Sequence, residues 1–543
     1  MPRWLYGVVF ALAFALTVAM AFYTDSAWED WYITYRASQN LAAGNGLVFS
    51  PGERVHTFTS PLGVLIPAGF AYAVGPEDEG LVLWLYRILN ALVVGAAAVL
   101  LLWLASRLAM GLWPVLLLLG LFLLDAKMLI FSINGMETAY LVFFIAMALF
   151  CLHGDLRRRF LWLGLAWAGL MWTRPDGCIY IAAIGLGWLI FCPAIPGVAS
   201  RRDYLVLYVK AALVTTALYL PWFAWAWWYY GSPVPNTILA KGLRFSQDDP
   251  PGYLYHTLIF PYLVTYHGRA ADLIFTQPYL NYFNDGIAWT GYVSRVLVSL
   301  AIFQWILPLG LSREARAASL TAMLALFYMV VIVPTHYPWY IPGFALLVYW
   351  ALARGLQDWQ GRAAPAKGRG RLAPAAVAAV LLFAAGVSVA TVHQMESFQR
   401  VVDRGLRAPL GEWLRQNADS PQDTVFIECL GYVGYYSELK MYDFPGLSSP
   451  EMVAARKELQ SDNWAELISY LKPDWVVVRD FEIDVINASD PTVLSNQYTL
   501  AKRFDEREVV RSIPWVPGRD MLERDDNFFI FARRPEAGVT GGE

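Results

Sequence analysis

The chain has 543 residues, of which 57% are hydrophobic and only 16% are charged, and it contains 23 tryptophans. This composition excludes an ordinary soluble globular protein and predicts a mainly α-helical polytopic membrane protein. The net charge of −3 does not point to any partner, and no nucleic acid is expected. Three of the four cysteines lie in or beside apolar runs, which excludes a disulfide framework in the polar C-terminal part.

Apolar runs long enough to cross a membrane follow one another through the first 392 residues, once tilt and breaks at Pro or Gly are allowed for. We count 11 such runs, at 4–22, 81–104, 112–131, 138–152, 160–173, 177–192, 204–228, 291–309, 317–333, 339–353 and 372–392. The expected organisation is therefore a transmembrane domain over 1–392, with a first outer loop at 23–80, and a separate domain over 393–543.

Basic residues fall on every second loop between these runs. They are Arg3, Arg107, Arg157, Arg158, Arg159, Arg201, Arg202, Arg313, Arg316, Arg354, Arg362, Lys367, Arg369 and Arg371. The positive-inside rule places all of them on the cytoplasmic side of the membrane, with the N-terminus inside and the C-terminal domain outside. A cleaved signal peptide is the alternative for the first run, but an apolar stretch of about 18 residues is longer than the usual 7–15, which favours a retained anchor.

The polar segment 24–61 follows the first run and holds Glu29 and Asp30 among aromatic residues. Its pattern predicts a helix over 31–43, with Asp30 as N-cap and Gly44 just past the end. Two short strands are predicted at 47–49 and 54–58, around a Pro-Gly turn. A second apolar helix over 62–74 is too short to span and is expected to lie along the membrane surface.

After residue 392 the composition changes to an ordinary soluble mixture, which predicts an extracytoplasmic α/β domain. Helices are expected over 406–416, 450–459 and 464–471, and strands over 424–429 and 475–478. The run GYVG at 431–434 lacks the full spacing of a nucleotide-binding loop and favours a tight turn between strand and helix.

Several ionisable residues are candidates for chemistry at the outer face. Glu29 and Asp30 form a carboxylate pair that can act as a general base, and the alternative is that Asp30 only caps a helix. Arg174 is suited to binding a phosphate, and the alternative is a simple ion pair with Asp176. Four other outer-side candidates either bind an anion or only extend to the lipid headgroups: Lys127, Lys241, His56 and His336. Glu137 lies at the head of an apolar run, where its negative charge also favours the helix N-terminus. No zinc-ligand spacing and no Walker or Rossmann motif occurs, so no cofactor is required, and dependence on a divalent metal stays open.

The first outer loop carries a specific set of motifs: EDWYITYR at 29–36, NLAAGNGLVF at 40–49, PGE at 51–53 and TSPL at 59–62. With NGMET at 134–138, TRPDG at 173–177, YYG at 229–231, PNT at 235–237 with Lys241, and GYVGYYS at 431–437 with Asp443 and GL at 446–447, they cover most of the chain. This set resembles bacterial GT-C glycosyltransferases related to the mycobacterial terminal arabinofuranosyltransferase.

The resemblance implies a GT-C fold and transfer, with inversion, of a sugar from a polyprenyl-phosphate donor to an acceptor hydroxyl at the extracytoplasmic face of a bacterial inner membrane. It implies Asp30 as the general base, although this chain has Glu29-Asp30 where the family motif has Asp-Asp. The donor phosphate would then be bound by Arg174, Lys241, Lys127 or His336, and the substrates contacted by His56, Glu137 or Asp176.

The sequence thus predicts a membrane glycosyltransferase acting on a cell-envelope glycan, lipid or protein among membrane lipids, with arabinofuranose as one candidate sugar. A transporter or flippase for lipid-linked glycans is a second hypothesis, but it would place polar groups at mid-membrane. A third is a non-catalytic envelope assembly protein, in which Glu29 and Asp30 could be replaced without loss.

Overall fold

The computed structural model describes residues 1–154, 156–242, 271–276, 289–331, 337–363 and 372–535. The part before the C-terminal domain is helical. Its elements are α1 (Arg3–Thr24), α2 (Glu29–Ala42), α3 (Pro61–Val74), α4 (Glu79–Arg107), α5 (Leu112–Leu124), α6 (Ala126–Ile133), α7 (Thr138–His153), α8 (Arg159–Thr173), α9 (Gly177–Phe191), α10 (Arg201–Tyr230), α11 (Asn236–Gly242), α14 (Trp289–Ile302), α15 (Arg313–Val331), η2 (Pro338–Tyr340), α16 (Ile341–Ala363), α17 (Leu372–Phe398) and η4 (Gln399–Arg407).

The helices pack into one bundle in which α4 lies between α1 and α7, α8 lies against α10, and α9 lies against α15. Its core consists mainly of Leu, Ala, Val, Ile and Phe side chains, together with some Trp, Tyr and Met. Four helical stretches of the described chain are long and apolar enough to cross a membrane: α1, α4, α10 and the continuous helix Leu372–Asn417. Shorter apolar helices, which include α7, α9 and α14, complete the bundle, so the count of 11 spans stays a prediction.

The expected single span at 112–131 is broken into α5 and α6, which are bent by 43° relative to each other. Asp125 lies at the break in an extended conformation, and its side chain accepts a hydrogen bond from the Lys127 backbone N–H at 3.0 Å. This carboxylate caps α6, so the polar residue ends one helix and begins the next.

The first outer loop folds as α2, an irregular segment and α3. The prediction of two strands at 47–49 and 54–58 was wrong. Groups outside a sheet donate hydrogen bonds to the backbone carbonyl oxygens that strand pairing would use. The Asn40 side chain donates to the Val48 and Phe49 oxygens at 2.9 and 3.0 Å. The His56 oxygen accepts from the Asn236 N–H at 2.8 Å. The helix expected over 62–74 is present as α3, and Ser60 caps it by accepting from the Gly63 N–H at 2.8 Å.

The C-terminal domain is α/β, as predicted. Its elements are α18 (Ala408–Asn417), β1 (Thr424–Ile427), α19 (Leu430–Ser437), β2 (Lys440–Asp443), α20 (Pro450–Leu459), α21 (Trp464–Leu471), β3 (Trp475–Val478), α22 (Asp480–Ser489), α23 (Thr492–Gln497), β4 (Tyr498–Asp505), α24 (Arg507–Ser512), α25 (Arg519–Arg524) and β5 (Asn527–Arg533). The sheet order is β2-β1-β3-β5-β4. The first three strands are parallel, and β5 is antiparallel to both β3 and β4.

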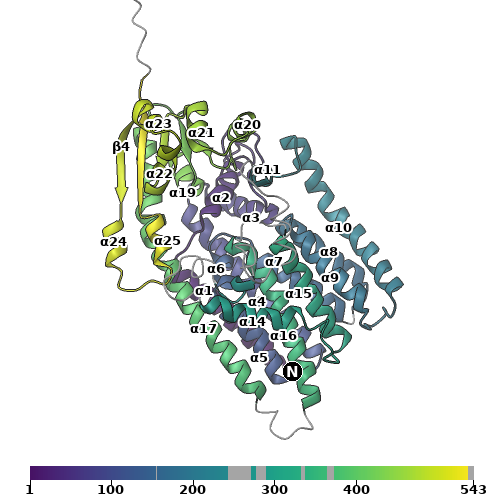
Figure 1. Cartoon of the computed structure of the whole chain (residues 1–543). Coiled ribbons are helices and arrows are strands. Elements are labelled where there is room, and N and C mark those ends of the chain that lie inside the picture. Colours follow the sequence, from purple (N-terminus) through teal and green to yellow (C-terminus); the bar gives the residue numbers. More distant parts are fainter. Residues whose placement is uncertain (155, 243–270, 277–288, 332–336, 364–371, 536–543) are drawn as a thin grey trace, which may run out of the picture.

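Figure 1 shows the domain at one end of the helical bundle, with α2, α3 and α11 between the two parts and the N-terminus near the opposite end. The helix α17 runs from the far end of the bundle toward the domain and continues through η4 into α18. The polar first outer loop is therefore enclosed between the apolar bundle and the α/β domain.

Candidate active site

Helix α2 places Asp30 at the boundary between the bundle and the C-terminal domain. The helix begins at Glu29, and Trp28 is its N-cap, so the expectation that Asp30 is the N-cap was wrong. The start of α2 is fixed by the Trp28 N–H, which donates to the Asn134 oxygen at 2.7 Å. Gly135, the next residue after Asn134, allows α2 to lie this close to the backbone at 134–135. Its φ is +94°, and a side chain at this position would overlap the Trp31 ring.

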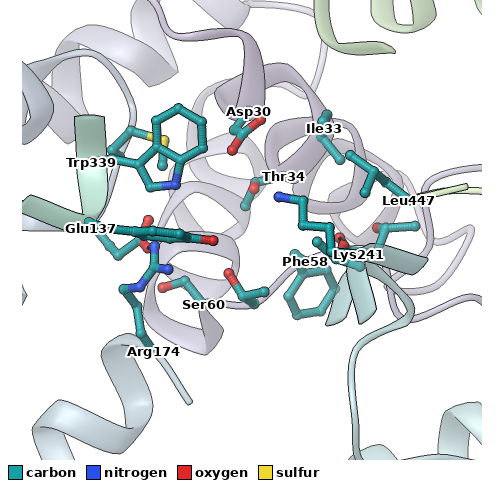
Figure 2. A pocket seen from close by; sticks show the side chains of 15 residues that line it. Asp30, Ile33, Thr34, Phe58, Ser60, Glu137, Arg174, Lys241, Trp339 and Leu447 are labelled. Atoms are coloured by element: carbon teal, nitrogen blue, oxygen red, sulfur yellow. Dashed lines mark hydrogen bonds and ion pairs between the residues drawn. The ribbon is translucent and has the colours of Figure 1, made fainter. Parts of the chain in front are cut away.

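A pocket opens on the face of α2 that carries Asp30. Its lining comes from seven separate parts of the chain, and Figure 2 shows the side chains directed into it. The lining residues are Asp30, Ile33, Thr34, Thr57, Phe58, Thr59, Ser60, Met136, Glu137, Arg174, Thr237, Lys241, Trp339, Tyr340 and Leu447. The pocket thus combines one acidic residue from α2 with two cations from distant segments.

Arg174 enters the pocket from the turn between α8 and α9. Its Nη1 donates to Glu137 Oε1 at 2.7 Å and its Nε donates to Asp176 Oδ1 at 2.9 Å. The guanidinium lies over the Tyr340 ring, 4.6 Å from its centroid. These contacts hold the planar group in one orientation, which suits it to bind a phosphate oxygen.

Lys241 enters from α11, on another side of the pocket (Figure 2). Its Nζ lies 4.7 Å from the centroid of the Tyr337 ring. No carboxylate among the described residues forms a salt bridge with this ammonium group. The Lys241 side chain is half-buried, and an ammonium group over an aromatic face keeps its charge while its N–H donors stay available to a ligand.

The Asp30 carboxylate is half-buried and makes no hydrogen bond or ion pair with the described part of the chain. Burial raises the pKa of Asp30 above its usual value, although the positive charges of Lys241 and Arg174 act in the opposite direction. A carboxylate with a raised pKa is a stronger base, so this group can accept a proton from a hydroxyl placed in the pocket.

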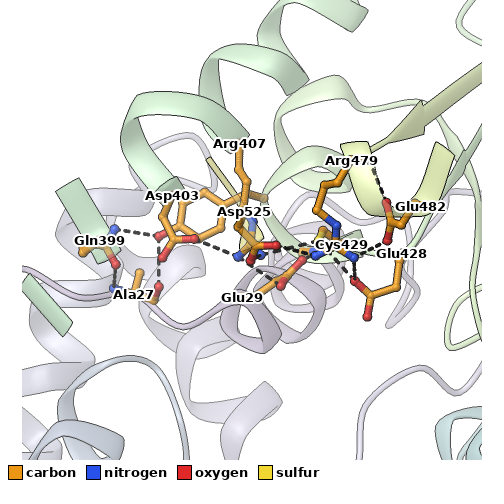
Figure 3. Close-up of polar contacts among 12 residues, drawn as sticks. Ala27, Glu29, Gln399, Asp403, Arg407, Glu428, Cys429, Arg479, Glu482 and Asp525 are labelled. Atoms are coloured by element: carbon orange, nitrogen blue, oxygen red, sulfur yellow. Dashed lines mark hydrogen bonds and ion pairs between the residues drawn. The ribbon is translucent and has the colours of Figure 1, made fainter. Parts of the chain in front are cut away.

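Glu29 is not among the residues that line this pocket, and its side chain lies in a buried charge cluster of the C-terminal domain (Figure 3). Its carboxylate accepts from the Gly431 N–H at 3.1 Å and lies 3.3 Å from Arg407 Nη1. Arg407 also pairs with Asp403 at 2.9 Å and with Asp525 at 2.8 Å. Burial is the largest influence on Glu29 and raises its pKa to about 7, although Arg407 opposes this.

Of the remaining predicted site residues in the described part of the chain, two lie in or beside the pocket and two lie away from it. Glu137 lines the pocket and Asp176 supports Arg174 beside it. Lys127 does not reach the pocket, because it is 2% exposed and its Nζ pairs with Asp125 at 2.8 Å. His56 lies against the Tyr230 ring at a centroid distance of 4.5 Å, outside the lining, and burial lowers its pKa to about 4. His336 lies outside the described residues.

Tyr340, Ser60 and Leu447 line the pocket but were not predicted as site residues. Tyr340 belongs to the aromatic run 337–340 at a predicted outer end, which is the signal that could have identified it. Ser60 was noted as part of the TSPL motif at 59–62. Leu447 lies in the C-terminal domain, and only its place in the GL motif pointed to it.

Comparisons with known proteins were made for the sequence and for the fold. A family model described as a domain of unknown function (DUF8728) matches residues 393–530. No curated protein matches the chain.

Three solved structures resemble the whole chain. ArnT from Cupriavidus metallidurans, bound to undecaprenyl phosphate, has a TM-score of 0.51 at 11% identity and covers 100% of both chains. The Archaeoglobus fulgidus oligosaccharyltransferase, in complex with Zn and sulfate, has a TM-score of 0.52 at 12% identity over 92% of this chain and 72% of that one. Arabinofuranosyltransferase AftD from Mycobacteria has a TM-score of 0.46 at 14% identity over 99% of this chain and 40% of that one.

The two neighbours with TM-scores above 0.5 have the GT-C fold, so the predicted resemblance is confirmed at the level of the fold. The chain has a GT-C type fold of apolar helices, to which an α/β domain is joined.

Proposed function

We propose that this protein is an inverting glycosyltransferase of the bacterial inner membrane. It transfers a monosaccharide from a polyprenyl-phosphate donor to a hydroxyl group of a cell-envelope glycan, lipid or protein. The observation that carries the proposal is the joint placement of Asp30, Arg174 and Lys241 around one pocket of a GT-C fold. The likeness to a structure that holds undecaprenyl phosphate supports a donor of this class.

In the proposed reaction, Asp30 accepts the proton of the acceptor hydroxyl. The acceptor oxygen forms a bond to the anomeric carbon, and the bond from that carbon to the phosphate oxygen breaks on the opposite side. A single displacement of this kind inverts the anomeric configuration. The released polyprenyl phosphate carries additional negative charge, which Arg174 and Lys241 stabilise because both cations are fixed before the reaction starts.

The donor approaches from the lipid phase, and two aromatic residues of η2 are available in the pocket lining to contact it. These two residues are Trp339 and Tyr340. Glu137 and Asp176 orient Arg174 and so act on the donor phosphate through it. Glu29 acts on the position of Asp30 through the start of α2. The motifs of the first outer loop make an arabinofuranosyl donor the first substrate to test.

Asp30→Asn is the test of the assignment. The amide keeps the shape of the side chain but cannot take the proton, so transfer should fall at least about a hundredfold, the usual contribution of general-base catalysis. Binding of polyprenyl phosphate should change little, since the base contributes mainly in the transition state. Thr34→Ala, one turn further along α2 and also in the pocket lining, is the matched control for a local change of shape.

An Asp30→Asn protein that keeps more than about a tenth of wild-type transfer would exclude Asp30 as the base. Wild-type protein that moves a lipid-linked glycan across vesicles but transfers no sugar would instead identify a flippase.

A further inference from the structure

The helix α11 carries Lys241 into the pocket, and it is only seven residues long. Isolated helices shorter than about 12–15 residues are marginal in water, so α11 depends on tertiary contacts for its order. On one side it is bonded to the first outer loop. The Asn236 N–H donates to the His56 oxygen at 2.8 Å, and Thr237 Oγ1 donates to the Thr57 oxygen at 2.7 Å.

On the other side α11 is bonded to the C-terminal domain. Asn236 Nδ2 donates to the Gly446 and Leu447 oxygens at 2.7 and 3.2 Å. Arg456 Nη1 donates to the Ala240 oxygen at 2.9 Å. Ala240 directly precedes Lys241 in the chain, so the domain holds the backbone next to the ammonium-bearing residue.

The surface of the domain that holds α11 is itself rigid. Arg456 is 2% exposed. Its Nη1 also donates to the Pro445 oxygen at 2.9 Å, and its Nε donates to Asp462 at 2.7 Å. The buried Asp443 carboxylate accepts from the Ser448 N–H at 2.9 Å and from the Leu447 N–H. The turn at 444–448 is therefore fixed from both sides, and Leu447 extends from it into the pocket.

We infer that the C-terminal domain is a structural part of the active site, in which Arg456 and Asn236 are positioning residues for Lys241. The inference rests on the proposed function, since it concerns the cation that meets the donor phosphate. A lysine on an unanchored segment would lose conformational freedom on binding phosphate, which reduces affinity. Because α11 is already docked on the domain, the backbone that carries Lys241 is ordered before the donor binds, and little further conformational freedom is lost on binding.

The experiment compares Asn236→Ala, Arg456→Ala and Lys241→Ala with the wild-type protein. Lys457→Ala, an exposed change on the same helix α20, is the matched control. Two quantities are measured: the amide hydrogen exchange of residues 236–242 by mass spectrometry, and the affinity for polyprenyl phosphate. Thermal unfolding shows whether each variant is folded, and Asn236→Ala leaves the buried Arg456 network intact.

We expect faster exchange over 236–242 in Asn236→Ala and Arg456→Ala, with no change in Lys457→Ala. Affinity for polyprenyl phosphate should fall about threefold to tenfold in both, because each variant removes one or two hydrogen bonds from the anchor. In a Lys241→Ala background the same two changes should weaken binding no further, since their effect passes through Lys241.

Unchanged exchange over 236–242 in both variants overturns the inference, whatever the binding data show. The inference is also overturned if exchange over 236–242 becomes faster but Asn236→Ala and Arg456→Ala still weaken binding of polyprenyl phosphate fully in the Lys241→Ala background. The domain would then act on a group other than Lys241. If Lys241→Ala alone leaves affinity for polyprenyl phosphate unchanged, the phosphate role of Lys241 fails and the positioning role fails with it. The exchange data separate that result from a failure of docking.

Discussion

The Glu29 carboxylate accepts a hydrogen bond from the Gly431 N–H at 3.1 Å, and this bond joins the first turn of α2 to the first turn of α19. The two residues are 402 positions apart in the chain. A Cβ at position 431 would overlap the Glu29 backbone oxygen. The absence of a side chain at Gly431 therefore allows the C-terminal domain to approach the backbone of the residue that precedes Asp30.

Gly431→Ala should shift the start of α2 and displace Asp30. Overpacking in a close contact costs about 1–3 kcal/mol, so we expect a lower thermal unfolding temperature together with a loss of sugar transfer. Thermal unfolding in detergent and a transfer assay measure the two effects. Gly386→Ala is the control, because its Cβ would meet nothing within 4 Å and alanine favours a helix. A Gly431→Ala protein with wild-type stability and transfer would contradict this contact.

Parts of the C-terminal domain were predicted to the residue. The helices at Pro450–Leu459 and Trp464–Leu471 and the strand at Trp475–Val478 all agree with the structure. Each helix carries a complete local signal, since Ser449 and Asn463 cap them by accepting from the Met452 and Ala465 N–H groups. The buried strand reads as four consecutive apolar residues. Local sequence chemistry was enough for these elements.

Other features depend on residues far away in the chain and could not be predicted. β4 was missed because its exposed, charged sequence is ordered only by pairing with β5. The segment 54–58 was predicted to be a strand, but residues of α11 donate hydrogen bonds to its His56 and Thr57 backbone oxygens. Asp30 and Arg174 were identified by residue type and predicted side of the membrane. The sequence pattern could not show that Lys127 pairs with Asp125 while Lys241 faces the pocket.

Arg174→Lys should weaken binding of the donor phosphate although it keeps the positive charge. Arg174 uses one edge for Glu137, another for Asp176 and its face for Tyr340. A lysine ammonium cannot make these contacts together and present a fork to phosphate. We expect about tenfold weaker binding of a polyprenyl-phosphate analogue, the size of one charge-assisted hydrogen bond.

Arg400→Lys is the control for Arg174→Lys, because Arg400 is exposed and pairs only with Glu396 on its own helix turn among the described residues. Its affinity should equal that of the wild type. Equal affinities for Arg174→Lys, Arg174→Ala and wild type would assign the phosphate to another residue.

The predicted orientation in the membrane can be tested with single cysteines. The exposed or half-exposed Cys178 and Cys192 are first replaced by serine, which leaves the buried Cys151 and Cys429. Asn496→Cys, exposed in the C-terminal domain, should react with a membrane-impermeant maleimide in intact spheroplasts. Arg201→Cys, exposed at the start of α10, should react only after permeabilisation, because basic loops stay in the cytoplasm. The reverse labelling pattern would exclude the proposed orientation.

The stability of the fold should depend on pH through Glu29. Burial raises its pKa to about 7 from an ordinary value of 4.5, against the opposing charge of Arg407 and with the charges of Glu428 and Asp30 adding to the effect. The folded protein thus holds this proton more tightly than the unfolded chain does. The stability that the proton contributes is complete below about pH 4.5 and is lost as the pH rises through about 7.

Glu29→Gln removes this dependence, because the amide stays neutral and its oxygen can still accept from the Gly431 N–H. Its stability should therefore rise relative to wild type between pH 5 and pH 8, by at most about 3 kcal/mol at about 1.4 kcal/mol per pH unit of pKa difference. Thermal unfolding of both proteins in detergent across this range measures the difference. Glu396→Gln, which changes a partly exposed pair, should follow wild type throughout. Parallel curves for Glu29→Gln and wild type would show that Glu29 stays ionised in the fold, held by Arg407.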